Sequence, residues 1–129
     1  NVKSGNKSLR LNDLRPLFDN KNIGFVSLQY GDNSELITFN KDNNNPIIKI
    51  EEIDLFQQID DTISLIYCLD AVVTTPNVNV HFAGSIGKKC IVASPFDNEL
   101  FLYSKLNDGK CEWYKNQKTL ILTHGNYVY

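Results

Sequence analysis

Long apolar runs are missing from the sequence, and its opening residues lack the apolar stretch of a signal peptide. We therefore expect no membrane span. A basic stripe is also missing: the formal net charge is -2, and Lys and Arg are spread along the chain. Binding to a nucleic-acid backbone needs clustered cations, so the charge pattern argues against nucleic acid as a partner.

Cysteine and histidine are scarce. The three cysteines, Cys68, Cys90 and Cys111, form an odd set at wide spacing, and two of them lie in apolar segments where a thiol behaves as a small hydrophobe. The two histidines, His81 and His124, lie far apart in the sequence, which argues against a histidine-rich metal site. These scarcities predict a protein of the reducing cytoplasm, with no metal and no bound cofactor.

The common catalytic signatures do not occur either. The sequence contains no GxGxxG or GxxxxGK[ST] loop, no CxxC, no HExxH and no GxSxG. Two acidic pairs, at residues 51–52 and 60–61, are expected in a loop and on a solvated helix face. Solvation explains such pairs, so neither is expected to be catalytic.

What is present is the composition of a soluble globular domain: 129 residues, 42% hydrophobic and 22% charged. Apolar periodicity predicts helices over residues 11–18, 34–41, 55–69, 78–86 and 97–106, and strands over residues 23–29, 47–50, 71–74, 89–94 and 119–123. Asn12 is the expected N-cap of the first helix. The third helix is expected to pack on a sheet through Phe56, Ile59, Ile63, Ile66 and Tyr67, with Asp60, Asp61 and Thr62 on its solvent face.

Strands that alternate with helices indicate a parallel sheet covered on both faces. The expected fold is therefore α/β, a Rossmann-like doubly wound parallel sheet formed by residues 1–129 as a single domain. Such a domain normally begins with a strand, whereas this chain opens with a polar segment and a helix. We expect its first strand to be truncated and the chain to be a fragment of a larger protein.

Ligands of open parallel sheets gather outside the carboxyl ends of the strands, which directs attention to the strand-to-helix junctions. In the richest junction, hydroxyl and amide side chains crowd the start of the predicted helix over residues 78–86, where free N–H groups and the helix dipole favour a phosphate. His81 could donate a further hydrogen bond, and Gly84 would permit close approach. The candidate binding residues here are Thr74, Thr75, Asn77, Val78, Asn79, His81 and Gly84.

A structural interpretation of the same residues stays open. Thr75 and Asn77 are also common helix caps, His81 could be a surface or core histidine, and glycines serve packing and helix termination. The residue types at this junction do not separate these roles from ligand binding.

Two further junctions offer weaker candidates. Gln29 and Tyr30 supply an amide and a phenol that could hold a base or a ribose, although an ordinary strand end with a turn glycine has the same pattern. Lys3 and Ser4 could face an anion, although such a segment is more often a frayed terminus.

The order and spacing of several segments resemble the carboxyl-terminal domain of bacterial glycosyltransferases that are often fused to TPR repeats. Those proteins are similar in turn to the ADP-heptose heptosyltransferases. The resemblance rests on segments VKSG (2–5), FVSLQYGD (25–32), SLI (64–66), LDAVV (69–73), HFAGSIGKK (81–89) and CEWY (111–114). The family has His-Leu-Ala-Gly-Ala-Leu-Gly-Lys at the fifth of these segments.

This resemblance implies one half of a GT-B fold, in which the carboxyl-terminal domain holds a nucleotide-diphosphate-sugar donor and a missing amino-terminal domain binds the acceptor. The implied donor site comprises Lys3, Ser4, Gln29, Tyr30 and the segment from Thr75 to His81. These groups would stabilise the diphosphate leaving group without a metal. The general base of this family is expected on the missing half, so the chain would bind the donor without turnover.

The chain departs from the family pattern just before the histidine. Here it has PNVNV (76–80), where the family has Ser or Asp, a pair of small residues and Thr-Ala or a similar pair. Proline removes one N–H donor from a phosphate cradle. Two interpretations remain: a donor-binding domain for a different nucleotide sugar, or a non-catalytic α/β binding or interaction module with a degenerate transferase site.

Overall fold

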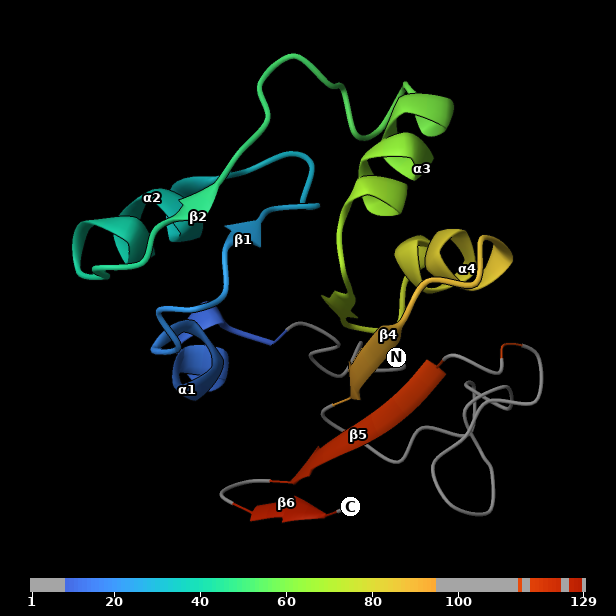
Figure 1. The fold of residues 1–129 in the computed structure, drawn as a ribbon. Coiled ribbons are helices and arrows are strands. Elements are labelled where there is room, and N and C mark those ends of the chain that lie inside the picture. Colours follow the sequence, from blue (N-terminus) through green and yellow to red (C-terminus); the bar gives the residue numbers. More distant parts are fainter. Residues whose placement is uncertain (1–8, 95–113, 115–116, 124–125, 129) are drawn as a thin grey trace, which may run out of the picture. The chain divides into compact units, whose positions relative to one another are not determined.

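The computed structural model describes residues 9–94, 114, 117–123 and 126–128. The chain divides into two compact units (Figure 1). The two-stranded unit is Arg10–Thr62, and the four-stranded unit comprises Asn1–Leu9 and Ile63–Tyr129.

The two-stranded unit is built around a short parallel strand pair. Its elements are η1 (Leu11–Leu14), α1 (Arg15–Phe18), β1 (Phe25–Val26), α2 (Ser34–Lys41) and β2 (Ile47–Ile48). Phe25 pairs with Ile47 and Val26 with Ile48 in parallel register. The buried core consists of Phe18, Leu36, Phe39 and Ile47, and Leu11, Leu14 and Phe25 pack against it. These helices and strands therefore pack around one shared hydrophobic core.

Two asparagine side chains supplement the short strand pair. Asn40, on α2, donates from Nδ2 to the Ile47 carbonyl oxygen and accepts the Ile47 N–H at Oδ1, both at 2.9 Å. Asn45 donates from Nδ2 to the carbonyl oxygens of Phe18, Asn20 and Ile23 at 3.4, 3.2 and 2.9 Å. Side-chain amides therefore satisfy backbone groups of β2 and of the chain that precedes β1.

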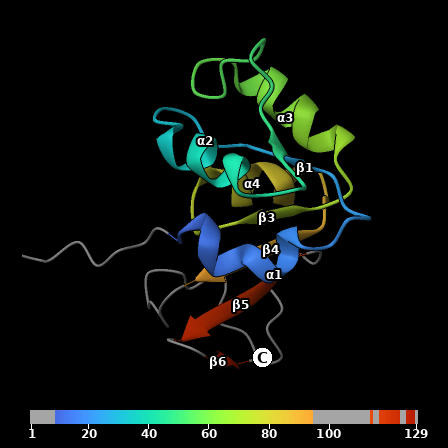
Figure 2. The same ribbon diagram turned by 90° about the vertical axis from the view of Figure 1, so that its left-hand side faces the viewer.

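The four-stranded unit has a mixed sheet of order β3-β4-β5-β6. Its strands are β3 (Val72–Thr74), β4 (Cys90–Ser94), β5 (Gln117–Thr123) and β6 (Asn126–Val128). The first three run parallel, and β6 is antiparallel to β5. Helix α3 (Ile59–Cys68) begins in the other unit and leads into β3, and α4 (Val78–Ser85) connects β3 to β4 and lies against both strands (Figure 2).

The β3-α4-β4 segment has well-defined ends. Asn77 caps the start of α4, and Gly87 follows its end with φ 69°, a left-handed conformation that suits glycine. The Lys88 N–H donates to the Ala83 carbonyl oxygen at 2.9 Å, which satisfies one of the last helical acceptors. Among the described residues of this unit, the buried apolar ones are Ile66, Val72, Val80, Ala83, Cys90, Val92 and Ala93.

Several sequence predictions are confirmed. An α/β chain with parallel strands is present, and α2 has the predicted bounds of residues 34–41. The predicted strands over residues 71–74 and 89–94 and the helix over 78–86 match β3, β4 and α4 to within one residue at each end. The predicted helix over residues 97–106, the loop around Asp108 and Gly109, Trp113 and His124 lie outside the described residues.

Other predictions are wrong in detail. The predicted strand over residues 23–29 is reduced to Phe25–Val26, because its parallel partner β2 is equally short. The first helix divides into η1 and α1, and its N-cap is Arg10, whose N–H donates to the Asp13 carboxylate at 3.0 Å. Asn12 therefore lies inside η1. The antiparallel strand β6 was not expected, and the strand predicted to begin at residue 119 begins at Gln117.

The helix predicted over residues 55–69 begins only at Ile59. Asp54 Oδ1 accepts the N–H groups of Phe56 and Gln57 at 2.9 and 3.1 Å, which holds the preceding residues in a turn. The predicted faces also need correction: Phe56, Ile59 and Tyr67 are exposed, whereas Thr62 is buried. Thr62 avoids the cost of an unpaired buried hydroxyl by donating to the Gln58 carbonyl oxygen at 2.8 Å.

Cysteine burial is mixed, since Cys90 is buried and Cys68 is exposed. In the part of the chain that the structure describes, no helix has the length and apolarity needed to cross a membrane.

Candidate functional site

The first candidate cluster lies at the start of α4, directly after the carboxyl end of β3. Asn77 is the centre of this cluster. Its Oδ1 accepts the Asn79 N–H at 2.8 Å, and its Nδ2 donates to the Thr74 hydroxyl at 2.9 Å and to the Thr75 hydroxyl at 3.5 Å. The Val80 N–H donates to the Asn77 carbonyl oxygen at 3.2 Å. The structure thus brings together four of the predicted site residues, Thr74, Thr75, Asn77 and Asn79.

The hydrogen bonds of this cluster determine what it can accept. Two N–H groups at the start of α4, those of Asn79 and Val80, are bonded to Asn77. An anion at this helix start would take the position of the Asn77 Oδ1 acceptor or would bind the N–H of Val78. Asn77 and Val78 are exposed, so solvent and ligands reach this position. The helix dipole still favours a negative charge here.

His81 lies one turn into α4 and is half-buried rather than facing solvent. Its Nδ1 lies 3.1 Å from the Tyr114 hydroxyl oxygen, and the two rings meet edge to face. The same tyrosine covers Gly84: a Cβ built at Gly84 would lie within 2.7 Å of three Tyr114 ring carbons. The close approach predicted at Gly84 is therefore that of the Tyr114 ring, which packs where a Cβ would lie. The Tyr114 hydroxyl also orients the His81 ring.

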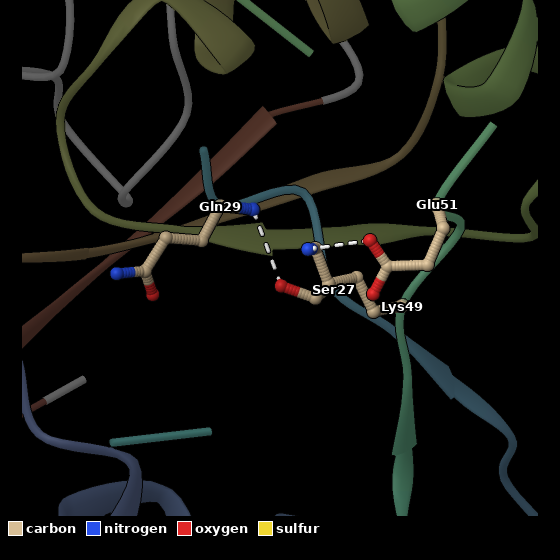
Figure 3. A network of polar contacts seen from close by, with 4 residues as sticks. All are labelled: Ser27, Gln29, Lys49 and Glu51. Carbon is tan, nitrogen blue, oxygen red and sulfur yellow. Dashed lines mark hydrogen bonds and ion pairs between the residues drawn. The ribbon is translucent and has the colours of Figure 1, made fainter. Parts of the chain in front are cut away.

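The second candidate cluster lies at the carboxyl ends of β1 and β2 (Figure 3). The Ser27 N–H donates to the Ile48 carbonyl oxygen at 2.8 Å, so the two strand ends are adjacent. Ser27 Oγ accepts the Gln29 N–H at 3.3 Å, and Lys49 Nζ contacts Glu51 Oε2 at 2.7 Å. The Gln29 side chain donates to the Asp32 carbonyl oxygen at 3.3 Å. A hydroxyl, a carboxamide and an ion pair thus line this edge.

Two aromatic rings belong to the loops that leave this edge. Tyr30 follows β1 and Phe56 follows β2, and their ring centroids lie 5.2 Å apart with the planes tilted by 45°. Both side chains are exposed, Tyr30 to 57% and Phe56 to 62%. Sequence reasoning identified Gln29 and Tyr30 but missed Lys49 and Phe56, because Phe56 was assigned to the buried face of a helix.

The loop after β1 also starts α2. Asp32 Oδ1 accepts the Ser34 N–H and Asp32 Oδ2 accepts the Ser34 hydroxyl, both at 2.9 Å. The hydrogen bond from the Ser34 backbone, followed by the one from its hydroxyl, lowers the pKa of Asp32 below its ordinary value of 3.8. This turn fixes the end of the loop that carries Gln29 and Tyr30.

A cavity of about 330 Å³ lies elsewhere in the two-stranded unit, against α2. Its charged groups already join η1 and α1 to α2: Glu35 accepts the Leu11 N–H at 2.8 Å, and Arg15 donates to the Asp42 carbonyl oxygen at 3.4 Å. The lining residues are Leu11, Asn12, Arg15, Ser34, Glu35, Thr38, Phe39 and Asp42. None of the predicted site residues is among them.

Lys3 and Ser4 lie outside the described residues, so the structure does not place them. Gln29 and Tyr30 belong to the two-stranded unit, and the residues from Thr74 to Gly84 belong to the four-stranded unit. Within the described residues, no group of three or more His, Cys, Asp and Glu side chains is arranged to hold a metal ion.

The chain is similar to one part of a longer known protein. No family model and no solved structure matches the chain. The chain is 34% identical over 93 residues to Protein FlbA from Caulobacter vibrioides, with 63% of this chain and 16% of that protein covered. The chain therefore corresponds to about a sixth of the length of that relative.

Proposed function

We propose that this chain is the donor-binding part of a metal-independent glycosyltransferase, a Rossmann-like half of a GT-B fold that binds a nucleotide-diphosphate sugar. The observation that carries this proposal is the β3-α4 junction, where an exposed helix start follows the carboxyl end of a parallel strand. This is the position at which open parallel sheets bind phosphate groups. The resemblance of the HFAGSIGKK segment to the family pattern supports the same assignment.

The cluster offers chemistry suited to a diphosphate. The Thr74 and Thr75 hydroxyls, the Asn77 carboxamide and the first N–H groups of α4 can donate to phosphate oxygens. A diphosphate that displaces the Asn77 Oδ1 cap would gain the Asn79 N–H. His81, oriented by Tyr114, would donate one further hydrogen bond as negative charge develops on the leaving group.

The catalytic base, the acceptor site and, where present, TPR repeats would lie in other parts of the protein. The partners of the proposed domain are therefore a nucleotide-sugar donor and an amino-terminal acceptor-binding domain. The proposed location is the cytoplasm, where nucleotide sugars would be available. The chain alone would bind donor without transferring the sugar.

The contacts of Asn77 and His81 also support a second candidate function. Asn77 and His81 are both bonded to neighbouring side chains or N–H groups, as expected of residues that cap a helix and pack a ring. A non-catalytic binding or interaction module that keeps the α/β scaffold would have the same contacts.

Calorimetric titration of the chain with UDP-, GDP- and ADP-sugars separates the two functions. We expect one class to bind with a dissociation constant in the millimolar range or below. His81→Ala should then weaken binding about tenfold, because a hydrogen bond to a charged phosphate is lost. Tyr114→Phe removes the hydroxyl that orients His81 but keeps the imidazole, so it should weaken binding less than His81→Ala does. Absence of binding by every nucleotide sugar would contradict the transferase assignment.

A further inference from the structure

The cavity against α2 carries charges of both signs. Its volume of about 330 Å³ lies within the range of small-molecule sites, roughly 300–1,000 Å³. Arg15 contributes a guanidinium group to the lining, and Glu35 and Asp42 contribute two carboxylates, so the lining has one net negative charge. All of the lining residues belong to the two-stranded unit, and none of them belongs to the proposed donor site.

The three charged residues are anchored to the backbone, yet their charges do not neutralise one another. Glu35 Oε1 accepts the Leu11 N–H at 2.8 Å, and one guanidinium nitrogen of Arg15 donates to the Asp42 carbonyl oxygen at 3.4 Å. Among the described residues, neither carboxylate forms an ion pair with Arg15, and no hydrogen bond reaches the Asp42 carboxylate or Glu35 Oε2. All three side chains are exposed, so a dissolved ligand reaches them.

The charges are spread along the length of α2. Glu35 lies in its first turn, and Asp42 is its C-cap seven residues later, which is about 10 Å along a helix axis. The contacts of Leu11 with Glu35 and of Arg15 with Asp42 show that η1 and α1 run along α2 in the same direction. One end of the cavity therefore has a single carboxylate, and the other end has a guanidinium group next to a carboxylate.

This order of charges describes a complementary ligand. Such a ligand has a cation at one end, and a carboxylate with an adjacent cation at the other. Leu11 and Phe39 supply apolar atoms to the lining, against which an aliphatic chain between these groups can pack. A free amino acid with a basic side chain has these groups in this order, and its net positive charge is opposite to that of the lining.

We propose that the cavity binds a free basic amino acid, for which L-lysine is the probe. Arg15 holds the α-carboxylate, because its planar fork of N–H donors matches the two carboxylate oxygens. Asp42 binds the α-ammonium group, and Glu35 binds the side-chain ammonium group at the other end of α2. The site does not depend on the proposed nucleotide-sugar site, so either assignment can fail without the other.

Calorimetric titration with four small molecules tests which groups the cavity recognises. We expect L-lysine to bind at least about fivefold more tightly than three analogues that each lack one charged group. L-norleucine lacks the side-chain ammonium group, cadaverine lacks the α-carboxylate, and Nα-acetyl-L-lysine lacks the α-ammonium group. Cadaverine has the larger positive charge, so preference for lysine over cadaverine requires the contact with Arg15.

Three results of these titrations would overturn the assignment. Absence of lysine binding at millimolar concentration would remove the site. Cadaverine that binds as tightly as lysine would indicate plain attraction of cations to acidic side chains. Nα-acetyl-L-lysine that binds as tightly as lysine would assign the cavity to a peptide with a carboxyl-terminal lysine instead of a free amino acid.

Variants of the charged residues assign each contact. Glu35→Gln keeps an acceptor for the Leu11 N–H, and it should weaken lysine binding about fivefold while norleucine binding stays unchanged. Asp42→Asn should weaken lysine binding by a similar factor and leave Nα-acetyl-L-lysine binding unchanged. Arg15→Gln should weaken lysine binding about tenfold and abolish the preference for lysine over cadaverine.

Two matched controls remove a charge elsewhere in the same unit. Glu52→Gln and Lys21→Gln change exposed residues outside the cavity lining, so both variants should bind lysine like the unaltered chain. If they weaken binding as much as Glu35→Gln and Arg15→Gln do, binding follows the net charge of the unit and the cavity assignment fails. Circular dichroism confirms that each variant is folded, and the titrations with ligand analogues need no variant.

Discussion

The two units use similar polar residues in different ways. In the four-stranded unit, a backbone ladder joins the strands, and the polar side chains at the start of α4 bond mainly to one another and to local N–H groups. In the two-stranded unit, each strand has only two residues, and the side chains of Asn40 and Asn45 bond to backbone groups of β2 and of the chain before β1. At its carboxyl edge, Gln29 and Glu51 are exposed, whereas Ser27 and Lys49 are half-buried.

This difference shows that residue type does not decide whether a side chain is available to a ligand. Asn77 has the chemistry of a phosphate-binding residue, yet it already caps a helix. Lys49 lies in a segment without a recognisable motif, yet it is a cation at the carboxyl end of β2 whose ion-pair partner Glu51 is exposed. Whether a polar side chain can bind a ligand depends on the hydrogen-bond and ion-pair partners that the fold gives it.

The largest expected effect concerns the asparagine side chain that bonds to the backbone of β2. Asn40→Ala removes two hydrogen bonds to the backbone of Ile47, a buried residue. We expect the free energy of unfolding to fall by about 2 kcal/mol, because each such bond contributes about 1 kcal/mol and both backbone groups lose their partner. Urea denaturation measures this change. The control Asn44→Ala, at an exposed position, should differ from the unaltered chain by less than about 0.5 kcal/mol. Equal stability of Asn40→Ala and Asn44→Ala would show that the Asn40 hydrogen bonds do not stabilise the two-stranded unit.

A smaller loss is expected from Gly84→Ala in the four-stranded unit. The new Cβ would overlap the Tyr114 ring, and displacement of that ring breaks its contact with His81. Overpacking costs about 1–3 kcal/mol, and the better helix propensity of alanine offsets up to about 1 kcal/mol of this. The net loss should lower the melting temperature by a few degrees. Gly24→Ala, where no atom lies within 4 Å of the new Cβ, is the control. An unchanged melting temperature for Gly84→Ala would show that Tyr114 does not pack on α4.

The smallest effect is a pH dependence at the start of α2. The hydrogen bonds from Ser34 lower the pKa of Asp32 in the folded state, so the charged carboxylate stabilises the fold above pH 3.8, its ordinary pKa. This contribution is lost as the pH falls through the lowered pKa. Urea midpoints of the chain and of Asp32→Asn should therefore differ at neutral pH and converge in acid. A difference that persists at about pH 2 would contradict the assignment.

Much of the fold followed from local pattern. The Ser34–Lys41 helix and the β3-α4-β4 segment were predicted because their apolar positions, caps and terminating glycine all indicate the same element. The lengths of β1 and β2 could not be predicted, because a strand extends only as far as its partner pairs with it. The asparagine contacts were hidden for a similar reason, since Asn45 bonds to carbonyl oxygens 22 or more positions away.

The candidate sites were predicted less completely. Thr74, Thr75, Asn77 and Asn79 were correctly grouped because they are neighbours along one junction. Tyr114 was missed as a partner of His81, because the contact joins positions 33 residues apart. Phe56 was misplaced because helical spacing continued past the turn at Asp54, where a side-chain acceptor rather than apolar periodicity decides the structure.

The most direct test of a nucleotide-binding chain is chemical-shift mapping with isotope-labelled protein and the nucleoside diphosphates ADP, GDP and UDP. The amides of residues 74–81, at the start of α4, should shift in proportion to occupancy. Shifts confined to the cavity beside α2, or no shifts at millimolar nucleotide, would contradict the account.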